Sequence, residues 1–168
     1  MRTLTRGAIW LTFLGYCALI VQLVVLKEMD AQSAVTNIFE RQRPSEWTTN
    51  NFTLFETIRL YWSDSRIPWT VRLSNLAGNV LGFLPFGILF PLLFRRKPSL
   101  LLTLFFGFLF SLGLELAQWF MAVGSFDVDD LLLNTIGVLI GYTAFRIVHA
   151  LVPIRTYLYP KSSNHSTH

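Results

Sequence analysis

Four apolar segments, each long enough to cross a bilayer as a helix, dominate this sequence and leave few folds open to it. A helix needs about 20 apolar residues to span the hydrocarbon core, because each residue advances the helix axis by about 1.5 Å. The chain is 52% hydrophobic with a mean hydropathy of +0.47, more apolar than a soluble domain of 168 residues needs to be. We therefore expect an all-α integral membrane protein, in which a single domain, residues 1–168, forms a four-transmembrane-helix bundle. The predicted spans are residues 7–26, 73–94, 99–123 and 130–152.

The first apolar segment also resembles a signal peptide. Arg2 and Arg6 precede it, and the sequence AQSA at residues 31–34 is similar to a cleavage site. Its apolar run is longer than the hydrophobic region of a typical signal peptide, so we expect a helix that stays in the membrane. The single cysteine, Cys17, lies within this segment, which excludes a disulfide framework within the chain.

Basic and acidic residues are separated along the chain. The two terminal segments and the RRK turn at residues 95–97 carry basic residues and no acidic ones, whereas the carboxylates lie in residues 27–72 and 115–130. Because Lys and Arg accumulate on the cytoplasmic side, we predict a multi-pass plasma-membrane protein with both termini cytoplasmic, including a tail at residues 153–168, and with residues 27–72 outside. The net charge of +4 follows from this bias. No basic and aromatic pattern typical of nucleic-acid binding is present.

The predicted outer segment, residues 27–72, has two parts. Residues 27–51 are polar, with Pro44 and a TTNN run, and are typical of a solvated linker or a partly ordered loop. From Phe52 the sequence FTLFETIRLYW places aromatic side chains close to one helical face, which predicts a short interfacial helix on the outer leaflet. A strand is the alternative, because Ile58, Leu60 and Trp62 also alternate.

Polar side chains interrupt three of the spans near their predicted outer ends. A carboxylate in the centre of a bilayer costs about 2.5 to 3.5 kcal/mol, and such residues are usually functional. Spacings of i, i+4 and i+7 place the polar and small residues of each helix on one face. We predict that one cavity open to the outer leaflet is lined by Asn79, Glu115, Gln118 and Asn134. Including the acidic turn that precedes the last span, the candidate ligand-binding residues are Asn79, Glu115, Gln118, Asp127, Asp129, Asp130 and Asn134.

Small residues and a proline predict how the helices pack. The spacings Gly78-x-x-x-Gly82 and Gly137-x-x-x-Gly141 permit close approach of two helices in lipid. Pro85 removes a helical hydrogen bond and predicts a kink that widens a cleft above it.

Three motifs together resemble the VanZ-like membrane proteins. They are NLAGNVLGFLPFGILFP at 75–91, SLGLELAQWF at 111–120 and FDVDDLLLNTIGVLIGY at 126–142, and the resemblance covers roughly residues 52–146. Gly82 departs from the family pattern, which more often has a bulky aliphatic residue there. The resemblance implies a bacterial envelope protein associated with resistance to lipoglycopeptide antibiotics such as teicoplanin.

Three kinds of function remain open for the polar cluster. A binding module would present carboxylates and amides to a cationic or hydrogen-bonding head group of a lipoglycopeptide, a lipid-linked cell-wall precursor or a partner protein, in contact with membrane lipids. A membrane enzyme would hold Mg²⁺ or Ca²⁺ between Glu115, Asp130 and either Asp127 or Asp129, and act on a phospholipid or a lipid-linked precursor. A transporter would carry protons or cations through Glu115, although the deeper half of the bundle lacks polar residues that continue a path.

Each polar residue also has a structural interpretation. The amides of Asn79, Gln118 and Asn134 can hold helices together through hydrogen bonds worth roughly 0.6 to 2 kcal/mol. Asp127 and Asp129 can belong to a solvated turn or cap the last span.

Overall fold

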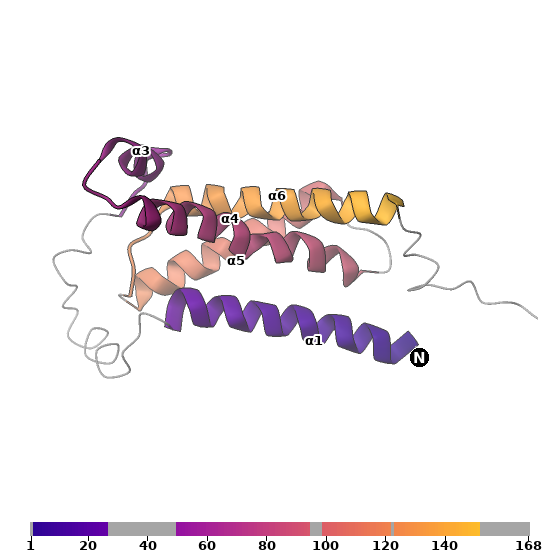
Figure 1. The fold of residues 1–168 in the computed structure, drawn as a ribbon. Coiled ribbons are helices and arrows are strands. Elements are labelled where there is room, and N and C mark those ends of the chain that lie inside the picture. The colour runs from indigo at the N-terminus through magenta and orange to yellow at the C-terminus, as the bar shows by residue number, and fades with distance from the viewer. Residues whose placement is uncertain (1, 27–49, 95–98, 122, 152–168) are drawn as a thin grey trace, which may run out of the picture.

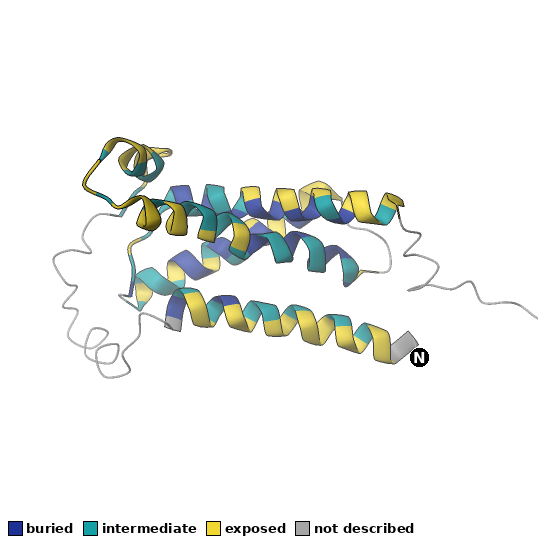
Figure 2. Ribbon diagram, in the orientation of Figure 1, coloured by how far each residue is buried: buried dark blue, intermediate teal, exposed yellow. Residues whose placement is uncertain are grey.

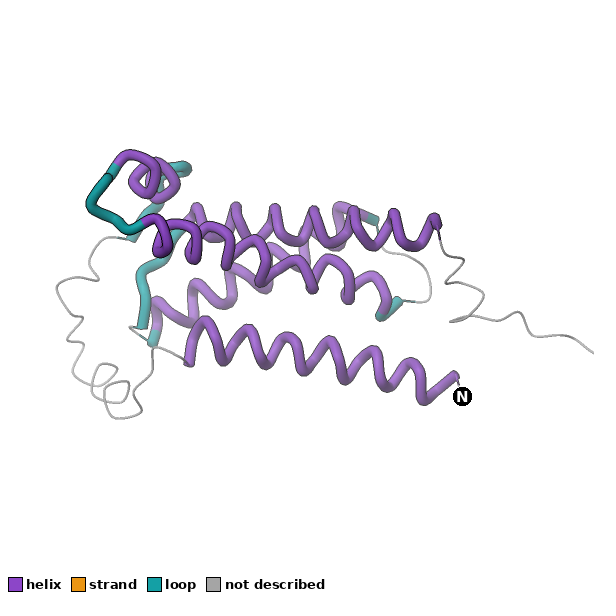
Figure 3. Tube along the Cα trace, viewed as in Figure 1, coloured by secondary structure: helices purple, strands orange, loops and turns teal. Residues whose placement is uncertain are grey.

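The computed structural model describes residues 2–26, 50–94, 99–121 and 123–151, and all regular structure in these residues is helical (Figures 1 and 3). Four helices are long and apolar enough to cross a membrane, as predicted. The short helix α3 lies at one end of the bundle, opposite the N-terminus of α1 (Figure 1). The elements are α1 (Arg2–Val21), the π-helix η1 (Gln22–Leu26), α3 (Glu56–Ser63), α4 (Trp69–Leu92), α5 (Leu100–Phe120) and α6 (Val128–Leu151).

Local capping moves three helix ends away from the predicted boundaries. α4 begins at Trp69 because the carbonyl of Pro68 accepts hydrogen bonds from the N–H groups of Val71 and Arg72. α5 begins one residue after Ser99, whose hydroxyl accepts from the N–H of Leu102. α6 begins at Val128, directly after a side-chain cap from the acidic turn.

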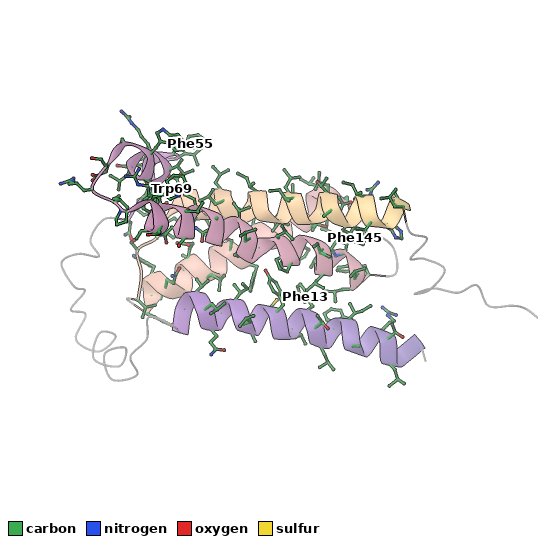
Figure 4. The ribbon with its side chains drawn as sticks, viewed as in Figure 1. Phe13, Phe55, Trp69 and Phe145 are labelled. Atoms are coloured by element: carbon green, nitrogen blue, oxygen red, sulfur yellow. The ribbon has the colours of Figure 1, made fainter. Side chains whose placement is uncertain are left out.

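The helix predicted in the outer segment is present, and the alternative strand is wrong. α3 begins at Glu56 instead of Phe52, and an isolated bridge between Asn51 and Asp127 precedes it. Of the predicted linker or partly ordered loop at 27–51, the structure describes only Asn50 and Asn51, and the bridge at Asn51 fits the partly ordered loop. Residues 27–49 lie outside the described residues. Phe52 and Phe55 are exposed, with Phe55 labelled beside α3 in Figure 4. The location of α3 on a membrane surface stays a prediction.

The backbones of α4 and α6 touch along the bundle, and these two helices form its most extensive interface. A Cβ at Gly137 would come within 2.2 Å of the carbonyl oxygen of Val80, and one at Gly141 within 2.1 Å of that of Leu84. Gly87 of α4 is equally close to α6. The predicted close approach at Gly137 and Gly141 is therefore confirmed, because only glycine fits there.

The same prediction is wrong for the other glycine pair. A Cβ at Gly78 would meet nothing within 4 Å, and one at Gly82 would meet only Ile20 Cδ1, at 3.9 Å. The spacing is the same in both pairs, but this one faces open space. α4 continues through Pro85 and Pro91, and the predicted kink at Pro85 stays a prediction.

The bundle exposes apolar side chains and buries polar ones. α1 and the outward faces of α5 and α6 are largely exposed (Figure 2), and their exposed residues are mainly Leu, Ile, Val and Phe. The buried residues include Thr103, Ser111, Glu115, Asp129 and Asn134. This distribution suits a protein surrounded by lipid, where an apolar surface needs no cover and polar groups must find partners inside.

Phenylalanine rings fill the middle of the helix interface. Phe13 of α1, on the side facing the other helices in Figure 4, lies 5.4 Å from the Phe86 ring of α4. Phe86 stacks on Phe90 at 5.3 Å and on Phe110 of α5 at 5.7 Å. Such ring contacts help to attach α1 to the bundle.

Candidate functional site

A partly open cavity of about 300 Å³ lies at the end of the bundle where α4 and α6 begin. Five of the seven predicted site residues line it: Asn79, Glu115, Gln118, Asp130 and Asn134. The rest of its wall is mainly apolar, including Leu23 and Val24 of η1, and also contains the amide of Asn75. Leu23, Asn75 and Gly78 are exposed at its edge, so the cavity opens sideways between η1 and the first turns of α4.

Two amides of the cavity tie the helices together. Asn79 Nδ2 of α4 donates a hydrogen bond of 2.5 Å to Asp130 Oδ1 of α6. Gln118 Nε2 of α5 donates to the backbone carbonyl of Val24 at 3.1 Å, which fastens η1 to α5. A π-helix often marks a functional site, and here it supplies an acceptor that the sequence did not reveal.

Glu115 is the deepest carboxylate of the cavity and is only 4% exposed. Its Oε2 accepts a hydrogen bond of 3.0 Å from the backbone N–H of Asp127. The side chain therefore touches both the cavity and the acidic turn before α6. A carboxylate buried this far needs such donors, because burial without them costs several kcal/mol.

Asn134 is buried beside Ser111, and only the NH2 group of its amide is hydrogen-bonded. Its Nδ2 donates to the Ser111 hydroxyl at 2.8 Å, so Ser111 of α5 positions the amide of α6. Asn134 is 5% exposed, and its Oδ1 has no hydrogen-bond partner among the residues that the structure describes. A buried acceptor without a partner costs about 1 to 3 kcal/mol, so this oxygen calls for an explanation.

Asp127 and Asp129 do not line the cavity, and the interpretation of Asp129 as part of a solvated turn is wrong. Asp129 is 0% exposed and accepts from the backbone N–H groups of Phe55 at 2.5 Å and Ile58 at 3.1 Å. It thus caps the N-terminus of α3 from another helix, where negative charge is favourable. Asp127 caps its own helix, because its Oδ1 accepts from the N–H of Asp129 at 2.8 Å, as the N-cap interpretation predicted.

Asn51 completes this attachment of α3, and sequence reasoning missed it. Its Nδ2 donates to Asp127 at 2.9 Å and to Thr57 at 3.0 Å, and the Thr57 hydroxyl donates to Asp127 Oδ2 at 2.6 Å. Its backbone pairs with Phe126 and Val128. No local pattern indicates a contact between residues so far apart in the sequence, although the TTNN run contains the residue.

Among the described residues, most carboxylates of this region lack a basic partner. The one ion pair there joins Arg66 to Asp64 at 2.8 Å, in the turn after α3. The Arg66 guanidinium holds the pKa of Asp64 at about 2, so this exposed pair stays charged at neutral pH. Burial, and then the carboxylates of Asp130 and Asp127, raise the pKa of the Tyr61 phenol, which remains neutral. The carboxylates of the cavity and the acidic turn thus have no basic partner within salt-bridge distance among the described residues.

The geometry gives no support to a metal centre. Among residues 2–26, 50–94, 99–121 and 123–151, no group of three or more His, Cys, Asp and Glu residues is placed to hold an ion. Glu115 and Asp130 face the cavity, but the third ligand expected from Asp127 or Asp129 is engaged with the α3 segment. The predicted enzyme with Mg²⁺ or Ca²⁺ therefore has no donor set in the described residues.

The spans and the buried polar cluster together define a multi-pass α-helical membrane protein with a polar cavity between its helices. The chain belongs to the VanZ/LLP1 family, which matches residues 13–149. It is 32% identical over 78 residues to Protein VanZ of Enterococcus faecium, an alignment that covers 46% of this chain and 48% of the relative. The chain thus spans about half the length of this curated relative. No solved structure matches it.

Proposed function

We propose that this protein lowers the susceptibility of a bacterial cell to lipoglycopeptide antibiotics such as teicoplanin by binding a membrane-inserted molecule in the cavity. The observation that carries the proposal is the cavity itself, which places Glu115, Asp130 and four amides against apolar walls. Membership of the VanZ/LLP1 family supports the context of antibiotic resistance. The molecule bound is the lipoglycopeptide, a lipid-linked wall precursor or another membrane lipid.

The shape of the site favours an amphiphile. Its polar groups lie inside the cavity, whereas Leu23 and Gly78 at the opening face the surroundings of the bundle. A molecule with a lipid tail could place its polar part inside and leave its tail in the bilayer. This arrangement distinguishes a lipid-tailed glycopeptide from one without a tail, since only the former reaches the site from within the membrane.

The proposal requires the cavity to face the outside of the cell. We propose that both termini lie in the cytoplasm of a bacterium, which puts α3 and the cavity at the outer leaflet of the plasma membrane. The separation of basic and acidic segments supports this orientation. The phenylalanine core beyond Phe83 carries no carboxylate in the described residues, which supports binding over transport across the bilayer.

Expression in a susceptible host that lacks the protein tests this function. We expect expression to raise the inhibitory concentration of teicoplanin more than that of vancomycin, because vancomycin lacks the lipid tail. An empty vector and a vector with an unrelated four-helix membrane protein control for general envelope stress. Equal changes for both drugs, or none, would contradict the proposal.

A further inference from the structure

The cavity is lined by four amides, and each is held by a hydrogen bond to the protein. Each of its four amides donates one N–H of its NH2 group to an acceptor of the protein, so the amide oxygen points away from that acceptor. The acceptors are Val71 O at 2.9 Å for Asn75, Asp130 Oδ1 at 2.5 Å for Asn79, Val24 O at 3.1 Å for Gln118 and Ser111 Oγ at 2.8 Å for Asn134.

The orientation of two of these amides is fixed by chemistry. A backbone carbonyl can only accept, so Asn75 and Gln118 must each direct their NH2 group toward it. Each NH2 group keeps a second N–H, while the amide oxygens and the carboxylates of Glu115 and Asp130 keep free acceptor positions. The two carboxylates favour a ligand that donates N–H groups and carries positive charge.

Asn134 points independently to a donor from outside the protein. Its Oδ1 is buried and has no partner in the described residues, although the side chain lines the cavity. A bound N–H group would satisfy this oxygen and remove the cost of leaving it unpaired. The carboxylates favour the same ligand, because among the described residues no Lys, Arg or His lies within salt-bridge distance of them.

We infer that the cavity recognises the primary ammonium group of an amphiphile, with N–H donors directed to Asn134 Oδ1 and to the carboxylates of Glu115 and Asp130. This inference rests on the proposed function in taking the cavity as a binding site. A primary ammonium offers three N–H donors and one positive charge, whereas a quaternary ammonium offers the charge without donors. A carboxylate or phosphate head group would instead place its negative charge beside Glu115 and Asp130.

A pair of matched amphiphiles tests the inference. Full-length protein in phosphatidylcholine nanodiscs is titrated with labelled dodecylammonium and with dodecyltrimethylammonium, which have the same tail and the same charge. We expect saturable binding of dodecylammonium at least about tenfold tighter than binding of its trimethyl analogue, since each lost hydrogen bond to a charged group is worth about 1.4 kcal/mol or more. Equal affinities of the two, or no saturable binding of either, would overturn the inference.

Variants separate recognition from folding. Glu115→Gln keeps the shape and an acceptor for the N–H of Asp127 but removes the charge, and Asn134→Leu removes the unpaired oxygen. Both should lose the preference for dodecylammonium. Asn134→Asp should retain or strengthen it, because an acceptor remains and negative charge is added. Glu56→Gln, which removes an exposed carboxylate of α3, should bind as the wild type does. If Glu115→Gln retains the full preference at wild-type thermal stability, the assignment is wrong.

Two competition arms identify the source of the ammonium. Phosphatidylethanolamine added to the nanodiscs would displace the label if the ligand is a lipid head group, and ethanolamine in solution would displace it if a free amine suffices. The susceptibility assay is independent of both arms. Protection without any ammonium preference would refute the inference and leave the proposed function, whereas the preference without protection would do the reverse.

Discussion

The backbone N–H of Asp127 donates to the carboxylate of Glu115 at 3.0 Å, and this bond joins the cavity to the segment that holds α3. On the other side, the Asp127 carboxylate accepts from Asn51 and Thr57. One turn of chain thus contacts both the deepest acid of the site and helix α3. A substitution at Glu115 or in the α3 segment should therefore alter the other, because both contact this turn.

Removal of the carboxylate that caps α3 should release this helix while the spans stay intact. Asp129→Ala takes away the acceptor for the N–H groups of Phe55 and Ile58, at an expected cost of about 1 to 2 kcal/mol to local stability. Hydrogen exchange should accelerate in residues 55–63 and remain unchanged in the middle of α4 and α6. Glu56→Gln is the matched control, and unchanged exchange in Asp129→Ala would show that Asp129 does not hold α3.

The two glycine pairs should respond differently to the same substitution. A methyl group at Gly141 would overlap the carbonyl of Leu84, so Gly141→Ala should separate α4 from α6 and destabilise the bundle by about 1 to 3 kcal/mol. Gly82→Ala meets only Ile20 at 3.9 Å and should leave stability near that of the wild type. Thermal unfolding of both variants in detergent checks the difference. Equal melting temperatures would contradict the packing of α4 against α6.

Labelling of a cysteine at Ser125 should establish the proposed orientation. Ser125 is exposed in the turn between α5 and α6 and lies at the same end of the bundle as the cavity. In a background with Cys17→Ala, we expect Ser125→Cys to react in intact cells with a thiol reagent that does not cross the membrane. A cysteine placed near the N-terminus should react only after permeabilisation. The reverse pattern would put the cavity in the cytoplasmic half of the membrane.

The spans could be predicted from the sequence because hydropathy and helical spacing are local properties. The gathering of Asn79, Glu115, Gln118 and Asn134 at one cavity could be predicted for the same reason: each lies on a polar stripe at a similar distance from a helix end. Their role in binding a ligand stays a prediction.

The errors come from contacts between distant segments. The capping of α3 by Asp129 and the pairing of Asn51 with Asp127 join residues more than 70 positions apart. The spacing of Gly78 and Gly82 shows that they share a helix face, but it does not show which residues pack against that face. Gly87 has no second glycine four residues away, so the sequence did not predict that α6 packs directly on it.

The central claim is that the buried carboxylates act on a ligand and do not merely hold the bundle together. The most direct test measures teicoplanin susceptibility in cells that express the wild type, Glu115→Gln, Asp130→Asn, Asn134→Ala or the control Glu56→Gln, with membrane abundance determined in parallel. We expect Glu115→Gln and Asp130→Asn to be present at wild-type abundance and to lose protection, because an amide keeps the shape of the side chain but not its charge. Asn134→Ala should weaken protection, and Glu56→Gln should protect fully. If both Glu115→Gln and Asp130→Asn protect as well as the wild type, these carboxylates are structural and the cavity is not the site of function.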